Sequence, residues 1–95
     1  MIKSLKIANH TVKVEMKDLS KTEYDGRYYP NENKMLLDST QNGKEADATM
    51  LHEFVHAIFS NTSLVHMNIS EDAQEALAHE ISEAIALNFK LTQRK

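Results

Sequence analysis

The segment LHEFVHAIF, residues 51–59, has the clearest periodic pattern of apolar residues in the chain. Its apolar members follow the i, i+3, i+4, i+7 and i+8 spacing that places side chains on one side of a helix; they are Leu51, Phe54, Val55, Ile58 and Phe59. The spacing predicts a helix over residues 45–60 with one buried face. The spacing of apolar residues changes at Gly43, so the segment before Gly43 is not predicted to be helical.

Before Gly43, apolar and polar residues alternate with the period of two that is typical of half-buried strands. The alternation predicts one hairpin around Asn9-His10, with Leu5, Ile7, Val12, Val14 and Met16 on its apolar side. A second hairpin is predicted from segments 24–29 and 34–38, because Pro30-Asn31-Glu32-Asn33 between them suits a turn. Residues 1–40 are therefore predicted to be β-rich and to form a small antiparallel sheet of about four short strands.

After a break at Asn61-Thr62-Ser63, a second helix is predicted over residues 70–90. Ser70 suits its N-cap, and acidic residues follow in the first turn, where the helix dipole favours them. Its main apolar stripe is expected to cover the sheet and comprises Ala73, Leu77, Ile81, Ala84 and Ile85. A second line is expected to pack against the first helix and comprises Glu75, Ala78, Ser82, Ile85 and Phe89. The fold class is predicted to be α+β, a sheet followed by two helices.

Length and composition limit the classes of function. The 95 residues suffice for a single domain, 1–95. Eleven Lys and Arg against fourteen Asp and Glu give a net charge of −3, so we expect no nucleic-acid partner. No cysteine is present, so disulfides, thiol nucleophiles and cysteine-ligated metals are excluded. Because no apolar run reaches the length of a signal peptide or a membrane span, we expect a cytoplasmic protein with no membrane partner.

Within the first predicted helix, residues 52–56 match the pattern H-E-x-x-H. His52 and His56 lie one turn apart on the same side of a helix, so both imidazoles can reach one metal ion, and Glu53 between them can act as a general base. The alternative is that both histidines are ordinary polar residues on a solvated helix face. A catalytic zinc ion needs a third protein ligand. Seven residues downstream are of a suitable type: His66, Glu71, Asp72, Glu75, His79, Glu80 and Glu83.

The sequence around this motif resembles a family of enzymes. Residues 49–58 are similar to the active-site helix of small gluzincin-type zinc peptidases, which include the ImmA/IrrE-type metallopeptidases and related phage proteins. Residues 75–85 are similar to the glutamate helix of that family, which implies that Glu75 is the third zinc ligand. Residues 26–38 are similar to the strand-turn-strand segment that precedes the active-site helix. His79 stands where the family usually has Asn.

The resemblance implies a zinc-dependent metallopeptidase that hydrolyses peptide bonds of a protein or peptide substrate. Zn²⁺ would be held by His52, His56 and Glu75, and Glu53 would be the general base for a metal-activated water. An extended substrate is expected along a sheet edge, with residues 34–38 as one candidate strand. An alternative is a zinc-stabilised, non-catalytic interaction or regulatory module of phage or mobile-element origin. A metal-free domain with a chance motif is a third reading, and the oligomeric state is left open.

Overall fold

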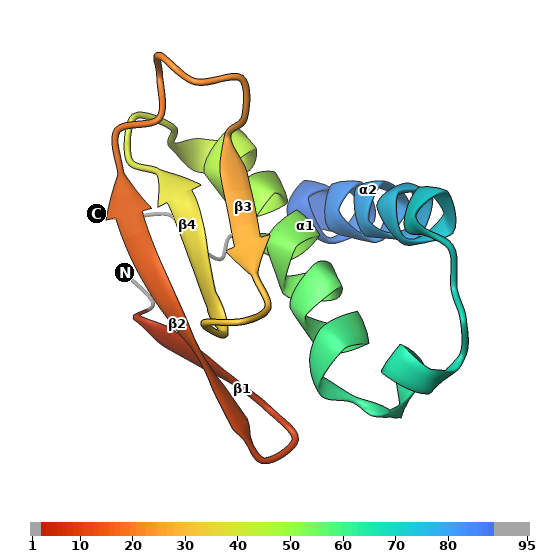
Figure 1. The fold of residues 1–95 in the computed structure, drawn as a ribbon. Coiled ribbons are helices and arrows are strands. Elements are labelled where there is room, and N and C mark those ends of the chain that lie inside the picture. The colour runs from red at the N-terminus through yellow and green to blue at the C-terminus, as the bar shows by residue number, and fades with distance from the viewer. Residues whose placement is uncertain (1–2, 89–95) are drawn as a thin grey trace.

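A computed structural model of the protein describes residues 3–88 and has the predicted α+β class. A four-stranded sheet, helix α1 and helix α2 follow one another as three layers (Figure 1). In the described residues no helix combines the length and the apolar character needed to cross a membrane. The elements in chain order are β1 (Ser4–Ile7), β2 (His10–Lys17), β3 (Gly26–Tyr29), β4 (Lys34–Asp38), α1 (Gly43–Asn61), the 3-10 helix η1 (Ser63–His66) and α2 (Glu71–Asn88).

Both predicted hairpins are present. In the first, β1 and β2 pair antiparallel and Ile7 lies opposite His10, so the turn is Ala8-Asn9, one residue earlier than predicted. Ala8 has a φ of 54°, the left-handed conformation that the turns of two-residue hairpins require. In the second, β3 and β4 pair antiparallel around the predicted turn at residues 30–33. The local alternation of apolar residues was therefore sufficient to predict each hairpin.

The sheet as a whole is mixed rather than antiparallel throughout. Its strand order is β1-β2-β4-β3, and the two central strands, β2 and β4, pair parallel from Lys13↔Lys34 to Lys17↔Asp38. The chain passes from β2 to the outer edge, forms β3 there, and returns with β4 in the middle. The more apolar strand of the second hairpin takes the central position, because Met35 and Leu37 of β4 are buried in the core.

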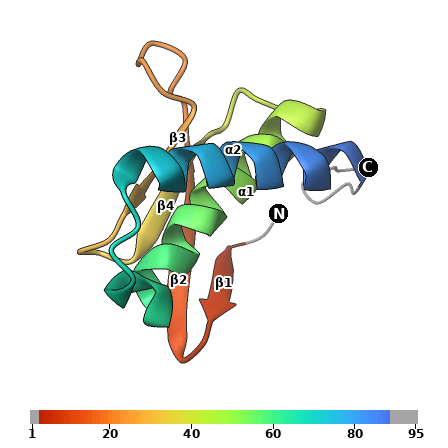
Figure 2. The same cartoon turned by 90° about the vertical axis from the view of Figure 1, so that its right-hand side faces the viewer.

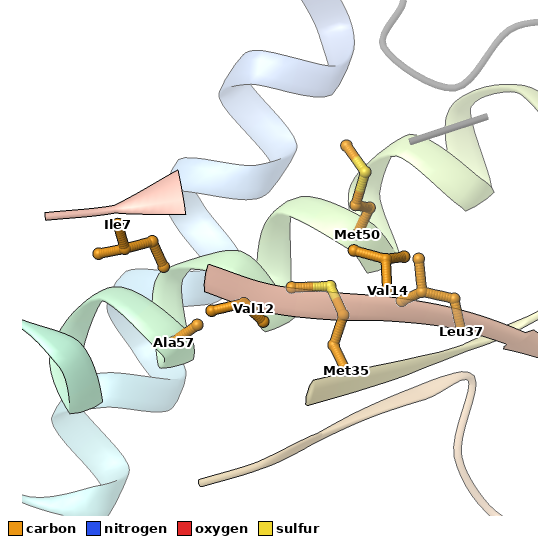
Figure 3. Close-up of a cluster of buried hydrophobic side chains, with 7 residues drawn as sticks. All are labelled: Ile7, Val12, Val14, Met35, Leu37, Met50 and Ala57. Atoms are coloured by element: carbon orange, nitrogen blue, oxygen red, sulfur yellow. The ribbon is translucent and has the colours of Figure 1, made fainter. Parts of the chain in front are cut away.

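The main core lies between α1 and one face of the sheet. Figure 3 shows this cluster, to which β1, β2, β4 and α1 all contribute: Ile7, Val12, Val14, Met35, Leu37, Met50 and Ala57. Gly26 is a point of close approach between β3 and α1, because a Cβ there would lie 2.7 Å from Cγ2 of Thr49. A side chain at this position would push the edge strand away from the helix.

Helix α2 packs on the side of α1 that faces away from the sheet (Figure 1). Its N-terminus is capped as predicted, since Ser70 Oγ accepts a hydrogen bond from the Ala73 N–H at 3.1 Å. The predicted second line faces α1, with Ala78 fully buried and Ser82 2% exposed; Phe89 of that line, and the predicted helix end at residue 90, lie outside the described residues.

The prediction that the main apolar stripe of α2 covers the sheet is wrong. Leu77 and Ile81 are 44% and 40% exposed, and Ala73 and Ala84 are also exposed. The physical reason is that α1 lies between α2 and the sheet and already covers the face that the stripe was expected to reach (Figure 1). Only the small side chains of the second line allow α2 to approach α1 closely.

The end of β4 is fixed by the buried carboxylate of Asp38, which is 5% exposed. It accepts hydrogen bonds from the N–H groups of Leu19 and Thr40 and from the hydroxyl of Thr40, at 3.1, 3.0 and 2.8 Å. The hydrogen bond from the Thr40 N–H is the main cause that holds the pKa of Asp38 below its usual value, against the opposing effect of burial. Asp38 thus joins the loop after β2 to the loop that leads into α1.

Candidate metal centre

Two histidines from successive turns of α1 form the centre of the site. The apolar stripe of α1 fixes the rotation of the helix, and this leaves His52 and His56 at the boundary between the core and solvent, with side chains 24% and 17% exposed. Their ring centroids are 5.1 Å apart. The H-E-x-x-H spacing therefore does place both imidazoles on one side of a helix.

Glu75, near the start of α2, reaches both histidines. Its Oε1 lies 2.8 Å from Nε2 of His56, and each of its carboxylate oxygens lies 3.3 Å from Nε2 of His52. The close packing of Ala78 and Ser82 against α1 holds the N-terminal turns of α2 beside the histidines. Glu75 is thus the one of the seven downstream candidates that the structure places beside both histidines. It is also the residue that the resemblance favoured.

These three side chains could hold a metal ion. One ligand atom from each of His52, His56 and Glu75 lies within 4.8 Å of the others. Burial alone would raise the pKa of Glu75, but hydrogen bonds from His56 and His52 bring that pKa below its usual value. The carboxylate is therefore ionised at neutral pH, which is the state in which it can be a ligand.

Glu53 points from α1 towards the edge strand β3. Together with Gly26 and Tyr28 of that strand, it lines the groove described below. Burial raises the pKa of Glu53 above its usual value, and the Glu75 carboxylate adds to this rise. The two histidines and the Tyr28 N–H act in the opposite direction without cancelling it. A carboxyl group with a raised pKa is suited to accept a proton and to return it.

The site opens into a groove of about 710 Å³ between β3, η1 and the start of α2. Glu53, His56 and Glu75 lie on its polar side. Its apolar wall includes Phe59 of α1 together with Leu64 and Ile69, which pack against the buried cluster that contains Phe59. A smaller cavity of about 250 Å³ adjoins the other side of Glu53 and His52, and Gly26 and Glu53 line both spaces. The metal centre therefore lies part-way along a continuous open surface rather than in an enclosed pocket.

The free sheet edge beside this groove belongs to β3 and not to the strand expected from sequence. β4 has β2 on one side and β3 on the other, so residues 34–38 have no free edge and the candidate substrate strand there is wrong. The Asp38 N–H donates to the Asp25 carbonyl, so by alternation the backbone groups of Gly26 and Tyr28 point outwards. Both residues line the groove.

The edge strand is also held by a network that sequence reasoning did not find. The Tyr28 hydroxyl donates to Oδ1 of Asn33 at 2.6 Å, and Nδ2 of Asn61 donates to the Tyr28 hydroxyl and to the same Asn33 oxygen at 3.0 and 3.1 Å. These bonds attach the C-terminal end of α1 to the β3–β4 turn. No local pattern could have predicted them, because Asn61 lies 33 positions after Tyr28.

The other candidate ligands lie apart from the metal group. His79 and Glu83 line the smaller cavity, and Glu71 lines the groove, but none of them belongs to the group of converging ligand atoms. The remaining three, His66, Asp72 and Glu80, are exposed and line neither space.

Comparisons of the chain with models of protein families, with curated proteins and with solved structures find no match. The resemblance to gluzincin-type peptidases therefore stays a prediction from the motifs.

Proposed function

We propose that the protein is a zinc-dependent metallopeptidase. The observation that carries the proposal is that the donor atoms of His52, His56 and Glu75 converge beside the Glu53 carboxyl in an open groove. Ligand atoms on a tetrahedral zinc ion lie about 3.3 Å apart at ordinary bond lengths. The distances of 2.8 and 3.3 Å from Glu75 to the two Nε2 atoms are close to this value, and two imidazoles with a carboxylate form a donor set that suits zinc.

The residues of the chain then have separate roles. Zinc, when bound, supplies a Lewis acid that activates water and polarises a carbonyl group. His52, His56 and Glu75 hold the ion, and the two helices that carry them fix its position relative to the groove. Glu53 takes a proton from the attacking water at its carboxylate and passes it to the amine that leaves. This carboxylate lies beside the edge strand, where the backbone N–H of Tyr28 acts to lower its pKa.

The substrate is proposed to be an extended peptide that lies along β3. The outward backbone groups of Gly26 and the outward carbonyl of Tyr28 are available for pairing with such a peptide. Next to these groups, Phe59, Leu64 and Ile69 offer an apolar wall to one of its side chains. The open groove accommodates a chain that continues on both sides of the metal centre.

The proposal is tested by measuring metal content and peptide cleavage on the same samples. Glu53→Gln should keep stoichiometric zinc and lose at least about a hundredfold in cleavage rate, because it removes a proton acceptor and no ligand. Glu75→Gln should lose both zinc and activity. Glu80→Gln is the matched control, since it removes the same charge from an exposed position of α2 and should change neither quantity.

Two results would reject the proposal. If the protein binds no zinc when the ion is supplied, the centre is not a metal site. If Glu53→Gln cleaves peptides as fast as the parent, Glu53 is not the proton acceptor. Stoichiometric zinc without cleavage of any peptide in a diverse library would favour the non-catalytic, zinc-stabilised module.

A further inference from the structure

The side of α2 that faces away from α1 carries large apolar side chains in contact with solvent. Figure 2 looks onto this helix, which lies in front of α1. Leu77, Ile81 and Leu87 are 44%, 40% and 66% exposed. Ala84 completes the surface, one turn from Ile81 and two from Leu77, and is also exposed. We call Leu77, Ile81, Ala84 and Leu87 the outer face of α2.

Single exposed apolar residues are normal on a folded protein, but a row of them along one helix needs an explanation. The spacing of the outer face is that of a buried helical stripe, and α1 already fills the place next to the sheet that such a stripe would otherwise occupy. Within the described residues no further layer covers it. The row has the pattern of an interface and no partner within this part of the chain.

The charges beside the outer face indicate the chemistry of that partner. Glu80 lies one turn after Leu77, and Glu83 lies one turn before Leu87. Both are exposed, and neither forms an ion pair with another described residue. From residue 71 to residue 88, α2 contains five acidic residues and no Lys or Arg. By helix geometry, Glu80 and Glu83 therefore lie on the same side of Leu77 and Ile81, with one of them on each side of Leu87. The surface is apolar at Leu77 and Ile81 and negative around Leu87.

This charge pattern argues against two occupants. A second copy that packed its own α2 on this face would bring Glu80 and Glu83 towards the same residues of its partner, and like charges across a contact are unfavourable. A bilayer rich in anionic lipids would meet the same repulsion. A segment with apolar residues at helical spacing, bordered by Lys or Arg, has neither problem.

We propose that the outer face of α2 docks a basic amphipathic helix of a partner protein. Apolar side chains of that helix would pack against Leu77, Ile81 and Leu87, and its basic residues would lie beside Glu80 and Glu83. From Leu77 to Leu87 the face is about 15 Å long, so it matches about three turns of a partner helix. The contact is separate from the groove, because none of these residues lines it. Of these residues, Glu83 also lines the smaller cavity beside Glu53 and His52.

Two synthetic peptides test the proposal by fluorescence anisotropy. Both have Leu at helical spacing over about four turns, and the polar positions are Lys in one and Glu in the other. The Leu/Lys peptide should bind the zinc-loaded parent protein, more tightly at low salt, and the Leu/Glu peptide should bind much more weakly. Leu77→Ser combined with Ile81→Ser should weaken binding about tenfold or more. Glu80→Lys combined with Glu83→Lys should reverse the preference between the peptides.

Matched variants separate this site from others on the molecule. Val65→Ser combined with Met67→Ser removes apolar residues that are 54% and 63% exposed outside α2, and it should leave binding unchanged. The proposal would be overturned if the Val65 and Met67 double variant weakened peptide binding as much as the Leu77 and Ile81 double variant. It would also be overturned if neither double variant of α2 changed peptide binding. A dimer in sedimentation velocity that Leu77→Ser dissociates would overturn it in favour of a second copy.

Discussion

Replacing Gly26 by alanine tests how the edge strand is held beside the metal centre. The new methyl group would lie 2.7 Å from Cγ2 of Thr49 and 3.2 Å from both the Leu36 carbonyl oxygen and Cδ2 of Leu37. The first distance is about 1 Å shorter than an ordinary contact between carbon atoms, so β3 or α1 has to move. Overpacking of this kind costs about 1–3 kcal/mol. The loss of backbone freedom in the unfolded chain offsets about 0.4–1 kcal/mol of that cost.

The expected net loss is therefore about 0.5–2.5 kcal/mol in the free energy of unfolding, measured by urea denaturation. Thr49→Ser provides a matched second change, because it deletes the Cγ2 atom of the shortest contact and keeps the hydroxyl. The double variant should regain at least half of the loss that Gly26→Ala causes. The rate of peptide cleavage should fall in Gly26→Ala, since β3 carries the proposed substrate edge. In the double variant the cleavage rate and the stability should both recover. A Gly26→Ala variant as stable as the parent, or no recovery with Thr49→Ser, would refute the close-approach argument.

Three further predictions concern zinc, pH and the β3 network. Zinc at about 100 times its Kd should add about 2.7 kcal/mol to the stability of the parent, seen as a higher melting temperature, and this gain should disappear with Glu75→Gln or a chelator. Asp38→Asn should lower the urea midpoint at pH 7. The pKa of Asp38 is lower in the folded protein than its ordinary value of 3.8, so ionised Asp38 stabilises the folded state above pH 3.8. This stabilisation is lost as the pH falls through the folded pKa, so the stabilities of the parent and the variant should become equal in acid. Asn61→Ala should cost about 1–3 kcal/mol by leaving the Tyr28 network unsatisfied. Asn88→Ala is its control, since among the described residues the Asn88 side chain donates to the Ala84 carbonyl one turn earlier, and an equal cost in both variants would contradict the role of the network.

The sequence was most informative where the relevant contacts are local. The hairpin positions and the rotation of α1 follow from apolar residues that are neighbours in the chain, and the i, i+4 spacing brings His52 and His56 together by helix geometry alone. The position of Glu75 came from the resemblance to a family, since its helical wheel placed it away from the main stripe. The structure shows why that placement is compatible with a ligand: the line with Ala78 and Ser82, rather than the stripe with Leu77, faces α1.

The features that could not be predicted depend on choices between equivalent packings. Alternation does not say which strand of the second hairpin becomes central, so neither the parallel β2–β4 pair nor the edge position of β3 could be derived. An amphipathic helix such as α2 has one apolar side whether that side packs on a sheet or on a partner protein. Only the structure shows that α1 already covers the face of the sheet that this side was expected to cover. The bonds of Tyr28 with Asn33 and Asn61 likewise depend on how the helix crosses the turn.

Glu75, the proposed third zinc ligand, lies on a helix whose contacts among the described residues are mainly with α1, and this has a consequence for the degradation of the protein. With zinc bound as proposed, the ion would tie the last described helix to the rest of the molecule, so metal occupancy and docking of that helix would be one linked equilibrium. Without the ion, α2 would separate more often and present its backbone to proteases. A cell depleted of zinc would then clear the unloaded chain by degradation and retain the loaded one.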